Sequence, residues 1–332
     1  MRIIRFHKIG GPEVLQFDNV DPVSPKGNEV LFKVQAFALN QADILFINGM
    51  HYTVPIFPSR IGSEAVGEVM EIGENVRNFK KGDIVTSIPF YTQEYGVQGE
   101  YATVPEIYLS KVPSGYSMEE ATSFWMQFLT AYYALFKLGK VEKDDFVFIV
   151  AASGTAGQGA LKLAKNRGAA VIASTRTSAK KQFLFDLGAD YVIVTQEENT
   201  LEKLKQISGK KGIKFVFDPI ATTEFTQQYM STLSFGGSAA IYGLLGGELP
   251  IFPILDLVRN NTRLYAYSLF NHVMDSDELQ EGKDYVFERI KDRKLKPIVD
   301  KVFDFEDTIE AYEYMLSNKQ RGKIVIKVGD WL

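Results

Sequence analysis

Residues 145–176 read DFVFIVAASGTAGQGALKLAKNRGAAVIASTR, and this stretch decides the fold. The apolar, β-branched run at 146–151 has the length of a buried parallel strand. Small residues break it at 153–157, where backbone amides could approach a ligand closely. Apolar residues then recur at helical spacing up to a stop at Arg167-Gly168, and a second apolar run follows at 170–173. The stretch therefore predicts a strand, turn, helix and strand of a parallel sheet.

The turn of this unit is a candidate site for the pyrophosphate of a dinucleotide, held at the N-terminus of the helix. Its glycines, Gly154, Gly157 and Gly159, depart from the usual G-x-G-x-x-G spacing. An ordinary tight turn of an α/β domain is the alternative interpretation. The strand and helix on either side favour nucleotide binding, with Gly154 and Gly157 at the pyrophosphate.

The end of the second strand indicates which dinucleotide is bound. An NAD site usually carries Asp or Glu there, to bind the ribose 2′-hydroxyl. Here the strand ends at Ser174-Thr175-Arg176, Lys180 follows one helical turn later, and the next acid is Asp186. Hydroxyls and a guanidinium would bind a 2′-phosphate, which an acid would repel. The sequence predicts NADPH as the cofactor; alternatively, Arg176 and Lys180 only begin a solvated helix.

Composition narrows the class of protein. A length of 332 residues suggests two domains, and a net charge of −4 gives no electrostatic footprint for nucleic acid. The absence of cysteine excludes disulfides and thiolate metal sites. The sequence shows neither a signal-like stretch nor an apolar run of membrane-spanning length. We expect a cytoplasmic protein that acts on a small molecule, with no nucleic acid and no membrane as a partner.

The rest of the chain fits an α/β protein with a β-rich first part. Residues 30–36 alternate in polarity as a half-buried strand does, and turn signals are frequent up to residue 83. From Ser117 the pattern is helical, beginning with the capping-box sequence Ser117-Met118-Glu119-Glu120 and an apolar helix at 130–138. Strands are then expected at 191–194, 215–218, 238–242, 264–267 and 323–328. Helical stretches between the first four predict a doubly wound parallel sheet.

Short motifs in a specific order connect the chain to a known family. They are Asn40-Gln41-Ala42-Asp43, Gly62-Ser63-Glu64-Ala65-Val66-Gly67, Lys80-Lys81-Gly82-Asp83, Gly99-Glu100-Tyr101-Ala102, Leu129-Thr130-Ala131-Tyr132, Ala152-Ser153-Gly154, Leu187-Gly188-Ala189-Asp190 and Arg321-Gly322-Lys323-Ile324-Val325. Over nearly its full length the chain resembles the zinc-free, zeta-crystallin-like quinone oxidoreductases among the medium-chain dehydrogenases/reductases. The resemblance implies a GroES-like β-rich catalytic domain at 1–123 and 266–332. A Rossmann NADPH-binding domain would occupy 124–265.

The residues predict that this member binds no zinc. Zinc-dependent relatives use a cysteine and the histidine of a Gly-His-Glu sequence. Here the first region reads Ala38-Leu39-Asn40, and Ser63 takes the histidine position. The three histidines, His7, His51 and His272, have no paired ligand spacing.

The resemblance implies roles for single residues in binding the cofactor. Asn40 and Thr130 would fix the nicotinamide carboxamide, and the backbone amides of Thr155 and Ala156 would bind the pyrophosphate. Ser174, Arg176 and Lys180 would take the 2′-phosphate, in agreement with the interpretation of the strand end above. Capping or turn roles are the alternative for Asn40 and Thr130.

A third group would line the nicotinamide side. Tyr242, Gly243 and Leu244 follow a strand at its carboxyl end, where open α/β sheets bind ligands. Ordinary core packing is the alternative role for Tyr242.

Without a metal, direct hydride transfer to a quinone is the expected reaction, because a quinone delocalises the incoming charge. An α,β-unsaturated carbonyl or enoyl thioester is the alternative acceptor, since related enzymes reduce these with a tyrosine proton donor. That tyrosine falls on Tyr52 in one alignment and on His51 in another. A low-turnover NADPH-binding sensor or RNA-binding crystallin-like protein is a second alternative. The resemblance further implies a homodimer, with edge strands pairing near Leu264–Tyr267.

Overall fold

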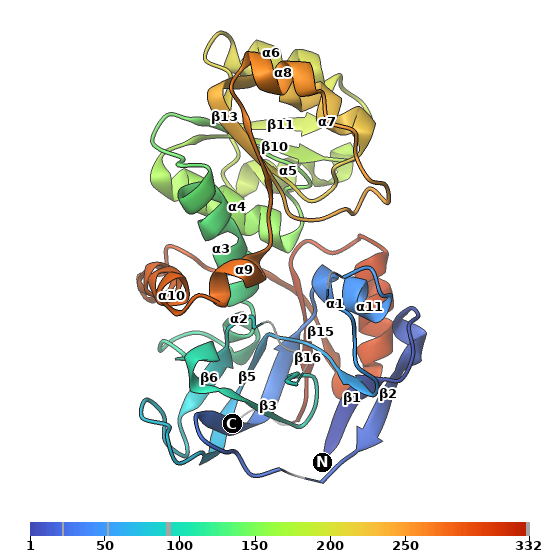
Figure 1. The fold of residues 1–332 in the computed structure, drawn as a ribbon, viewed down its shortest axis with the longest axis vertical. Helices are drawn as coiled ribbons and strands as arrows, with labels where there is room; N and C mark the ends of the chain where they lie inside the picture. The colour runs from blue at the N-terminus through green and yellow to red at the C-terminus, as the bar shows by residue number, and fades with distance from the viewer. Residues whose placement is uncertain (22, 52, 91–93, 330–332) are drawn as a thin grey trace. The chain divides into compact units, whose positions relative to one another are not determined.

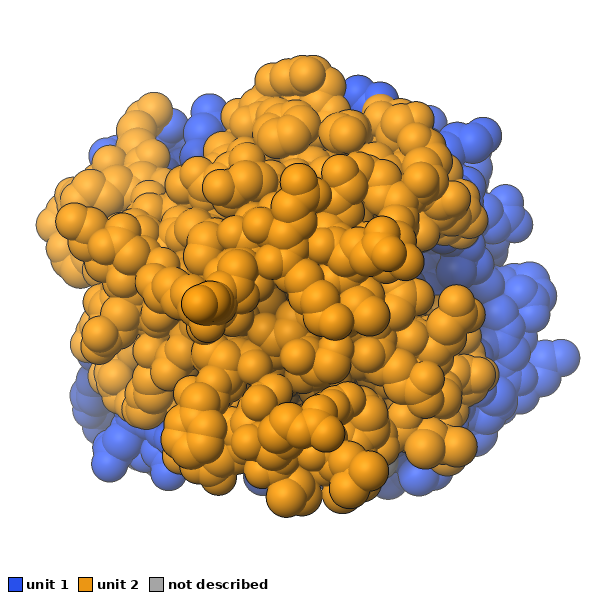
Figure 2. All heavy atoms as spheres, turned by 90° about the horizontal axis from the view of Figure 1, so that it is seen from above, with its two compact units in different colours: residues 1–126, 273–279, 296–332 blue, residues 127–272, 280–295 orange. Residues whose placement is uncertain are grey.

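The structure is a computed structural model that describes residues 1–21, 23–51, 53–90 and 94–329. The chain forms two compact units, which Figure 2 colours separately. The first unit contains residues 1–126, 273–279 and 296–332, and the second contains residues 127–272 and 280–295. In each unit, residues pack mainly against other residues of the same unit. The domain boundaries expected from the sequence, 1–123 with 266–332 and 124–265, stay a prediction. Within the described ranges, no helix is long and apolar enough to cross a membrane.

The second unit is built on six parallel strands in the order β11-β10-β9-β12-β13-β14 (Figure 1). The chain winds outward from β9 in both directions, which is the doubly wound arrangement that the sequence predicts. The strands are β9 Phe146–Ile149, β10 Ala170–Thr175, β11 Tyr191–Val194, β12 Ile213–Asp218, β13 Leu233–Ile241 and β14 Arg263–Ala266. The strand order reverses between β9 and β12, so a ligand-binding crevice is expected at the carboxyl ends of these two strands.

Helices connect these strands, as parallel pairing requires. They are α4 Thr155–Arg167, α5 Lys181–Asp186, α6 Thr200–Ser208, α7 Thr223–Met230 and α8 Ile254–Arg259, with a 3₁₀ turn η4 at Ser178–Lys180. The helix α4 begins and ends where the sequence predicts: Gly154 is its N-cap, and Gly168 closes it with a φ of 84°. Its apolar face, residues 160, 161, 163 and 164, is fully buried.

The first unit contains a mixed sheet in the order β15-β16-β3-β5-β6-β8, with β7 also paired to β3, and a small sheet β2-β1-β4. Its strands are β1 Arg2–Phe6, β2 Leu15–Asn19, β3 Glu29–Ala38, β4 Ser59–Arg60, β5 Ala65–Ile72, β6 Ile84–Ser87, β7 Tyr101–Pro105, β8 Leu109–Lys111, β15 Val299–Asp304 and β16 Lys323–Lys327. Figure 1 shows the C-terminal strand β16, in red, beside the blue strand β3. Val325 is opposite Ala38 in this antiparallel pair. The first unit therefore takes its strands from both ends of the chain.

The remaining helices lie in the first unit or have residues in both. The former are α1 Gln41–Ile47, α2 Met118–Ala121 and α11 Thr308–Leu316, with 3₁₀ turns η1 Pro12–Val14, η2 Glu106–Tyr108 and η5 Phe305–Asp307. The latter are α3 Trp125–Tyr132, α9 Leu269–Val273 and α10 Ser276–Lys291. A π-helical segment, η3 Tyr133–Leu138, continues α3.

Local signals place most of these elements correctly. The predicted capping box at Ser117 is confirmed: Ser117 Oγ accepts from the amide of Glu120, whose carboxylate accepts from the Ser117 amide. The expected strand at 191–194 is confirmed residue for residue. The first strand of the opening unit ends at Ile149, two residues before the predicted end, because Ala151 turns into the left-handed region with a φ of 50°. Helix α1, inside the part interpreted as β-rich, is not predicted.

Candidate functional site

The predicted pyrophosphate turn joins β9 to α4 in the second unit. We call residues 151–157 the nucleotide loop. A Cβ on Gly157 would lie 2.7 Å from the Cα of Ala152, so only glycine fits there without moving the backbone. At Gly154 the nearest atom to such a Cβ is 3.4 Å away, which is ordinary contact. Gly157 is therefore required by the packing of the loop against the helix, whereas Gly154 leaves its surface open.

The first amides of α4 make the loop a candidate anion site. The first N–H groups of a helix have no partner within it, and the helix dipole favours negative charge there. Thr155 and Ala156 begin α4 and are half-buried, and Gly154 is exposed. The side-chain amide of Gln158 donates to the carbonyl of Ser153 at 2.8 Å, which stiffens the loop. The residues present thus fit a pyrophosphate.

The end of β10 holds the loop as well as the predicted phosphate-binding residues. Ser174 is 1% exposed, and its Oγ accepts from the amide of Ala151 at 3.2 Å. The Ala152 amide donates to the Ser174 carbonyl at 2.9 Å. Ser174 therefore supports the left-handed turn at Ala151, a role that the sequence does not indicate. Arg176 is exposed and Lys180 half-buried.

A carboxylate from the loop after β11 contacts the segment that carries these two cations. The carboxylate of Glu197 accepts at 3.1 Å from the backbone amide of Ser178, which lies between Arg176 and Lys180 in the sequence. The amide of Gln196 donates to the Arg176 carbonyl, which places the Glu197 loop beside the end of β10. A negative charge here would oppose a bound phosphate, so Glu197 is a residue that motif reasoning missed.

The other predicted residues of the second unit lie after β13 and on α3. Tyr242 follows β13 and stacks on Phe217, with ring centroids 4.0 Å apart. Burial raises the pKa of Tyr242 well above its usual value, and the nearby Asp218 adds to the shift, so its hydroxyl stays protonated at neutral pH. Gly243 is half-buried and Leu244 is exposed. Thr130, on α3, accepts at its carbonyl from the Tyr267 hydroxyl at 2.8 Å.

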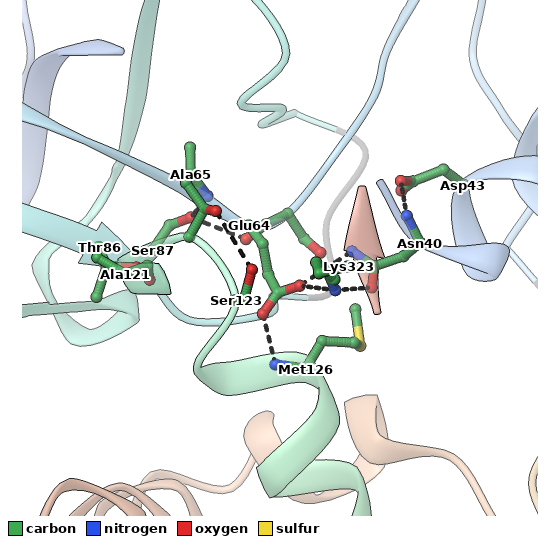
Figure 3. Close-up of polar contacts among 12 residues, drawn as sticks. Asn40, Asp43, Glu64, Ala65, Thr86, Ser87, Ala121, Ser123, Met126 and Lys323 are labelled. Atoms are coloured by element: carbon green, nitrogen blue, oxygen red, sulfur yellow. Dashed lines mark hydrogen bonds and ion pairs between the residues drawn. The ribbon is translucent and has the colours of Figure 1, made fainter. Parts of the chain in front are cut away.

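In the first unit, Asn40 belongs to a buried polar cluster, which we define as Asn40, Glu64 and Lys323 (Figure 3). Lys323 Nζ donates to Asn40 Oδ1 and to Glu64 Oε2, both at 2.6 Å. Asn40 Nδ2 donates to the same Glu64 oxygen at 3.2 Å. The second oxygen of Glu64 accepts from the amide of Met126 at 2.7 Å. The lysine and glutamate side chains are 0% and 1% exposed, so this is a fully buried ion pair.

Asp43 extends this cluster. Its carboxylate accepts from the Asn40 amide at 2.9 Å and faces Gln98, Tyr312 and, at longer range, Lys323 and Glu64. Burial raises the pKa of Asp43 from 3.8 to about 7, and the negative charge of Glu64 adds to the rise. The backbone amide of Asn40, the positive charge of Lys323 and the hydrogen bond with Tyr312 lower the pKa and so oppose this rise. Asn40 is the N-cap residue of α1, yet its side-chain amide is committed to Glu64 and Lys323.

The two candidate proton donors, His51 and Tyr52, are neighbours in the sequence. Tyr52 lies outside the described residues. His51 Nδ1 accepts from the Thr53 amide at 3.1 Å, and burial lowers the pKa of His51 to about 4. His51 is therefore a neutral imidazole at pH 7, and its imidazolium form is not available as an acid.

Glu64 and Lys323 belong to the family motifs, and the sequence does not indicate a role for either. The available signal is a charged residue at the start of an apolar run, in Lys323-Ile324-Val325-Ile326 and in Glu64-Ala65-Val66. Lysine and glutamate are almost never fully buried unless they are paired. Among the described residues, no group of three or more His, Cys, Asp or Glu side chains is arranged to hold a metal ion.

Family models match both parts of the chain. Residues 26–114 match the alcohol dehydrogenase GroES-like domain, and residues 156–287 match the zinc-binding dehydrogenase family. The predicted fold, a GroES-like domain with a Rossmann-like parallel-sheet coenzyme domain, is therefore confirmed.

Individual relatives match over almost the whole length. Quinone oxidoreductase 1 of Escherichia coli is 31% identical over 98% of this chain and 95% of its own. The 2-haloacrylate reductase of a Burkholderia species is 28% identical over 96% and 97%. The crystal structure of Escherichia coli quinone oxidoreductase complexed with NADPH superimposes with a TM-score of 0.89, at 28% identity over 99% and 100%.

Proposed function

The chain belongs to the quinone oxidoreductase family of medium-chain dehydrogenases/reductases, and we propose that it transfers hydride from NADPH directly to a quinone-like acceptor. One observation carries the choice of cofactor. The strand β10 ends in Ser174 and Thr175 and is followed by the exposed Arg176, where an NAD site would have an acid. The Escherichia coli relative that was crystallised with NADPH supports the same choice.

In this proposal the second unit binds most of the cofactor. The nucleotide loop binds the pyrophosphate through the backbone amides of Thr155 and Ala156, beside Gly154 and Gly157, since the first amides of α4 favour an anion. Arg176 and Lys180 pair with the 2′-phosphate, and Ser174 supports the loop and donates its hydroxyl hydrogen. Tyr242, Gly243 and Leu244 line the nicotinamide side at the carboxyl end of β13.

We also propose that Asn40 and Thr130 bind the nicotinamide carboxamide. When bound, the nicotinamide supplies the hydride, and these two residues orient it. A quinone needs no placed acid, because its reduced anion is delocalised and water can protonate it afterwards. The curated relative and the crystal structure from Escherichia coli both carry the name quinone oxidoreductase, which supports this acceptor class.

An α,β-unsaturated acceptor is the second candidate, and the similarity to a 2-haloacrylate reductase favours it. Protonation at carbon would then require a placed general acid. Tyr52 is the proposed donor, because a phenol is protonated at pH 7. His51 is the weaker choice, since burial holds its pKa at about 4 and leaves it neutral.

Steady-state oxidation of NADPH tests the proposal. The wild-type protein is assayed with 1,4-benzoquinone and 1,4-naphthoquinone, and separately with an enal and an enoyl thioester, while binding of NADPH and NADH is titrated. We expect quinone turnover with NADPH and much weaker binding of NADH. Turnover of the enal or thioester alone would support the second candidate. NADPH binding without turnover of any acceptor would favour the sensor or RNA-binding alternative.

We also propose a homodimer formed at the edge strand β14. Exposed apolar side chains gather in the neighbouring sequence: Phe235, Leu249, Ile251, Leu255 and Val258 are 71–82% exposed. An open strand edge with such residues nearby is an aggregation hazard unless a partner covers it. Light scattering should give a dimer for the wild type and a monomer for Leu255→Glu; a monomeric wild type would contradict this. The cytoplasmic location expected from the sequence stays a prediction.

A further inference from the structure

We propose that Lys323, together with Glu64, is a positioning residue that fixes the orientation of the Asn40 side-chain amide. The inference rests on the proposed function, in which Asn40 binds the nicotinamide carboxamide. It adds two residues to the machinery for hydride transfer, one from a strand at the C-terminal end of the chain and one directly before β5.

The chemistry of the three groups permits one orientation of the amide. A lysine ammonium only donates hydrogen bonds, and an ionised carboxylate only accepts them. Asn40 therefore turns Oδ1 toward Lys323 and Nδ2 toward Glu64, as the distances of 2.6 and 3.2 Å require. A reversed amide would place Nδ2 against an ammonium and Oδ1 against a carboxylate. Lys323 and Glu64 together thus prevent the amide from flipping.

The orientation suits a carboxamide ligand. The bond to Lys323 uses one lone pair of Oδ1, and the bond to Glu64 uses one of the two Nδ2 protons. Asn40 then has one further Nδ2 proton to offer from a fixed position, while the backbone amide of Asp43 faces its side chain in a capping box. The carbonyl oxygen of a primary carboxamide is the complementary acceptor. Fixing the amide before binding removes the cost of ordering it when the ligand arrives.

The backbone places Lys323 rigidly beside Asn40. The Lys323 amide donates to the Ile298 carbonyl at 2.7 Å, and the Leu39 amide donates to the Ile324 carbonyl at 3.1 Å. A Cβ on Gly322 would lie 2.5 Å from the Ile298 carbonyl oxygen, so glycine is required for this approach. The Gly322-Lys323 pair of the motif therefore serves to bring one ammonium to one amide.

Fold stability alone gives no reason to keep this ion pair. Desolvation of two charges offsets much of their attraction, and apolar replacements of similar volume are often as stable. A cluster kept only for packing would tolerate such a replacement without loss of ligand binding. If the cluster orients Asn40, the same replacement should weaken ligand binding.

The decisive variant combines Lys323→Met with Glu64→Gln, because Lys323→Met alone leaves Glu64 charged and buried and endangers folding. The combination removes both charges and keeps the shapes. The new glutamine carbonyl can accept from the Met126 amide, and its NH2 group then faces Asn40, which must turn Oδ1 toward it. This paired variant should therefore fold with the Asn40 amide reversed. Lys327→Met, the same substitution at the far end of β16, is the matched control.

Two ligands separate positioning from folding. NADPH carries the carboxamide, and 2′,5′-ADP carries only the adenosine phosphates. The paired variant should bind NADPH about tenfold more weakly or worse, the loss expected for a charge-assisted hydrogen bond. Its affinity for 2′,5′-ADP and its unfolding temperature should stay close to those of Lys327→Met. Asn40→Ala should show the same NADPH loss, and adding it to the paired variant should cost nothing more.

Three results would overturn the inference. They are wild-type NADPH affinity in a folded paired variant, equal losses for NADPH and 2′,5′-ADP, and losses that add to those of Asn40→Ala. Failure of the wild type to bind NADPH at all would instead refute the proposed function, and the inference would fall with it.

Discussion

The nucleotide loop and the buried polar cluster are assembled in different ways. The loop and the residues proposed to bind phosphate come from one continuous segment, 151–180, and would act through backbone amides, the exposed Arg176 and the half-buried Lys180. In the cluster, Lys323 is 259 positions from Glu64 and 283 from Asn40, and both charges are buried. A local segment can be recognised by its pattern, whereas the cluster exists only after the first unit has folded.

The largest difference between the buried cluster and the second unit should appear in the free energy of unfolding when an ion pair is broken. Lys323→Met leaves the Glu64 carboxylate buried without its cation, which should destabilise the protein by about 3–5 kcal/mol. Lys165→Met breaks a pair with Asp190 in the second unit, whose side chains are 34% and 36% exposed, and should cost less than about 1 kcal/mol. Urea unfolding of both variants measures the difference. Equal effects would mean that burial does not distinguish the two ion pairs.

Asp43, which adjoins the buried polar cluster, should make the free energy of unfolding depend on pH. Because burial raises the pKa of Asp43 from 3.8 to about 7, the unfolded chain releases this proton at lower pH than the folded chain does. The protonated carboxyl therefore stabilises the fold fully below about pH 4, and this contribution is lost as pH rises to about 7, by about 1.4 kcal/mol per unit. Asp43→Asn cannot titrate and should lack that fall.

Unfolding free energies of wild type and Asp43→Asn between pH 5 and 8 check this. The value for wild type minus the value for the variant should fall steadily up to about pH 7 and then stay constant, because the folded carboxyl is ionised above that pH. A difference that is constant over the whole range would place the pKa of Asp43 in its ordinary range.

Arg176→Ala tests whether the exposed segment after β10 binds the 2′-phosphate of NADPH. Loss of the guanidinium should weaken NADPH binding about 10- to 100-fold, the equivalent of about 1.5–3 kcal/mol for a charged hydrogen bond. NADH has no 2′-phosphate, so its affinity should hardly change, and the unfolding temperature should stay the same because the side chain is exposed. Equal losses for both cofactors would show that Arg176 does not contact the phosphate.

The smallest effect is expected at Glu197. Its carboxylate accepts from the Ser178 amide beside the proposed phosphate-binding cations. Glu197→Gln keeps an oxygen for that amide and removes the negative charge, so NADPH should bind about two- to fivefold more tightly. Titration of NADH is the control and should not respond. An equal gain for NADH would contradict repulsion of the 2′-phosphate.

The predictions from sequence succeeded where the signal is local. The helix stop at Gly168, the capping box at Ser117 and the strand Tyr191–Val194 follow from neighbouring residues alone. Helix α1 was missed because Asn40-Gln41-Ala42-Asp43 follows a long strand and lies in a region dense with turn signals. The π-helical continuation of α3 at Tyr133–Leu138 has no sequence signature that distinguishes it from an α-helix.

In the candidate site, too, only the local features can be read from the sequence, and the roles of its residues stay predictions. Gly157 and Arg176 could be named from the strand–turn–helix–strand pattern. The support of the loop by Ser174 and the charge of Glu197 depend on how separate strands align, so no local pattern reports them. Glu64 and Lys323 occur in motifs, but their pairing follows from the registers of β16 and β5 on β3.

The central claim is hydride transfer to an acceptor that needs no placed acid. It is tested most directly by kcat/KM for a quinone and for an enal, with NADPH, in wild type, Tyr52→Phe and His51→Ala. We expect Tyr52→Phe to leave quinone reduction within a few-fold of wild type. Any enal reduction should fall by about 10²–10⁴-fold, with His51→Ala close to wild type for both. Loss of quinone reduction in Tyr52→Phe, with NADPH affinity intact, would contradict the account.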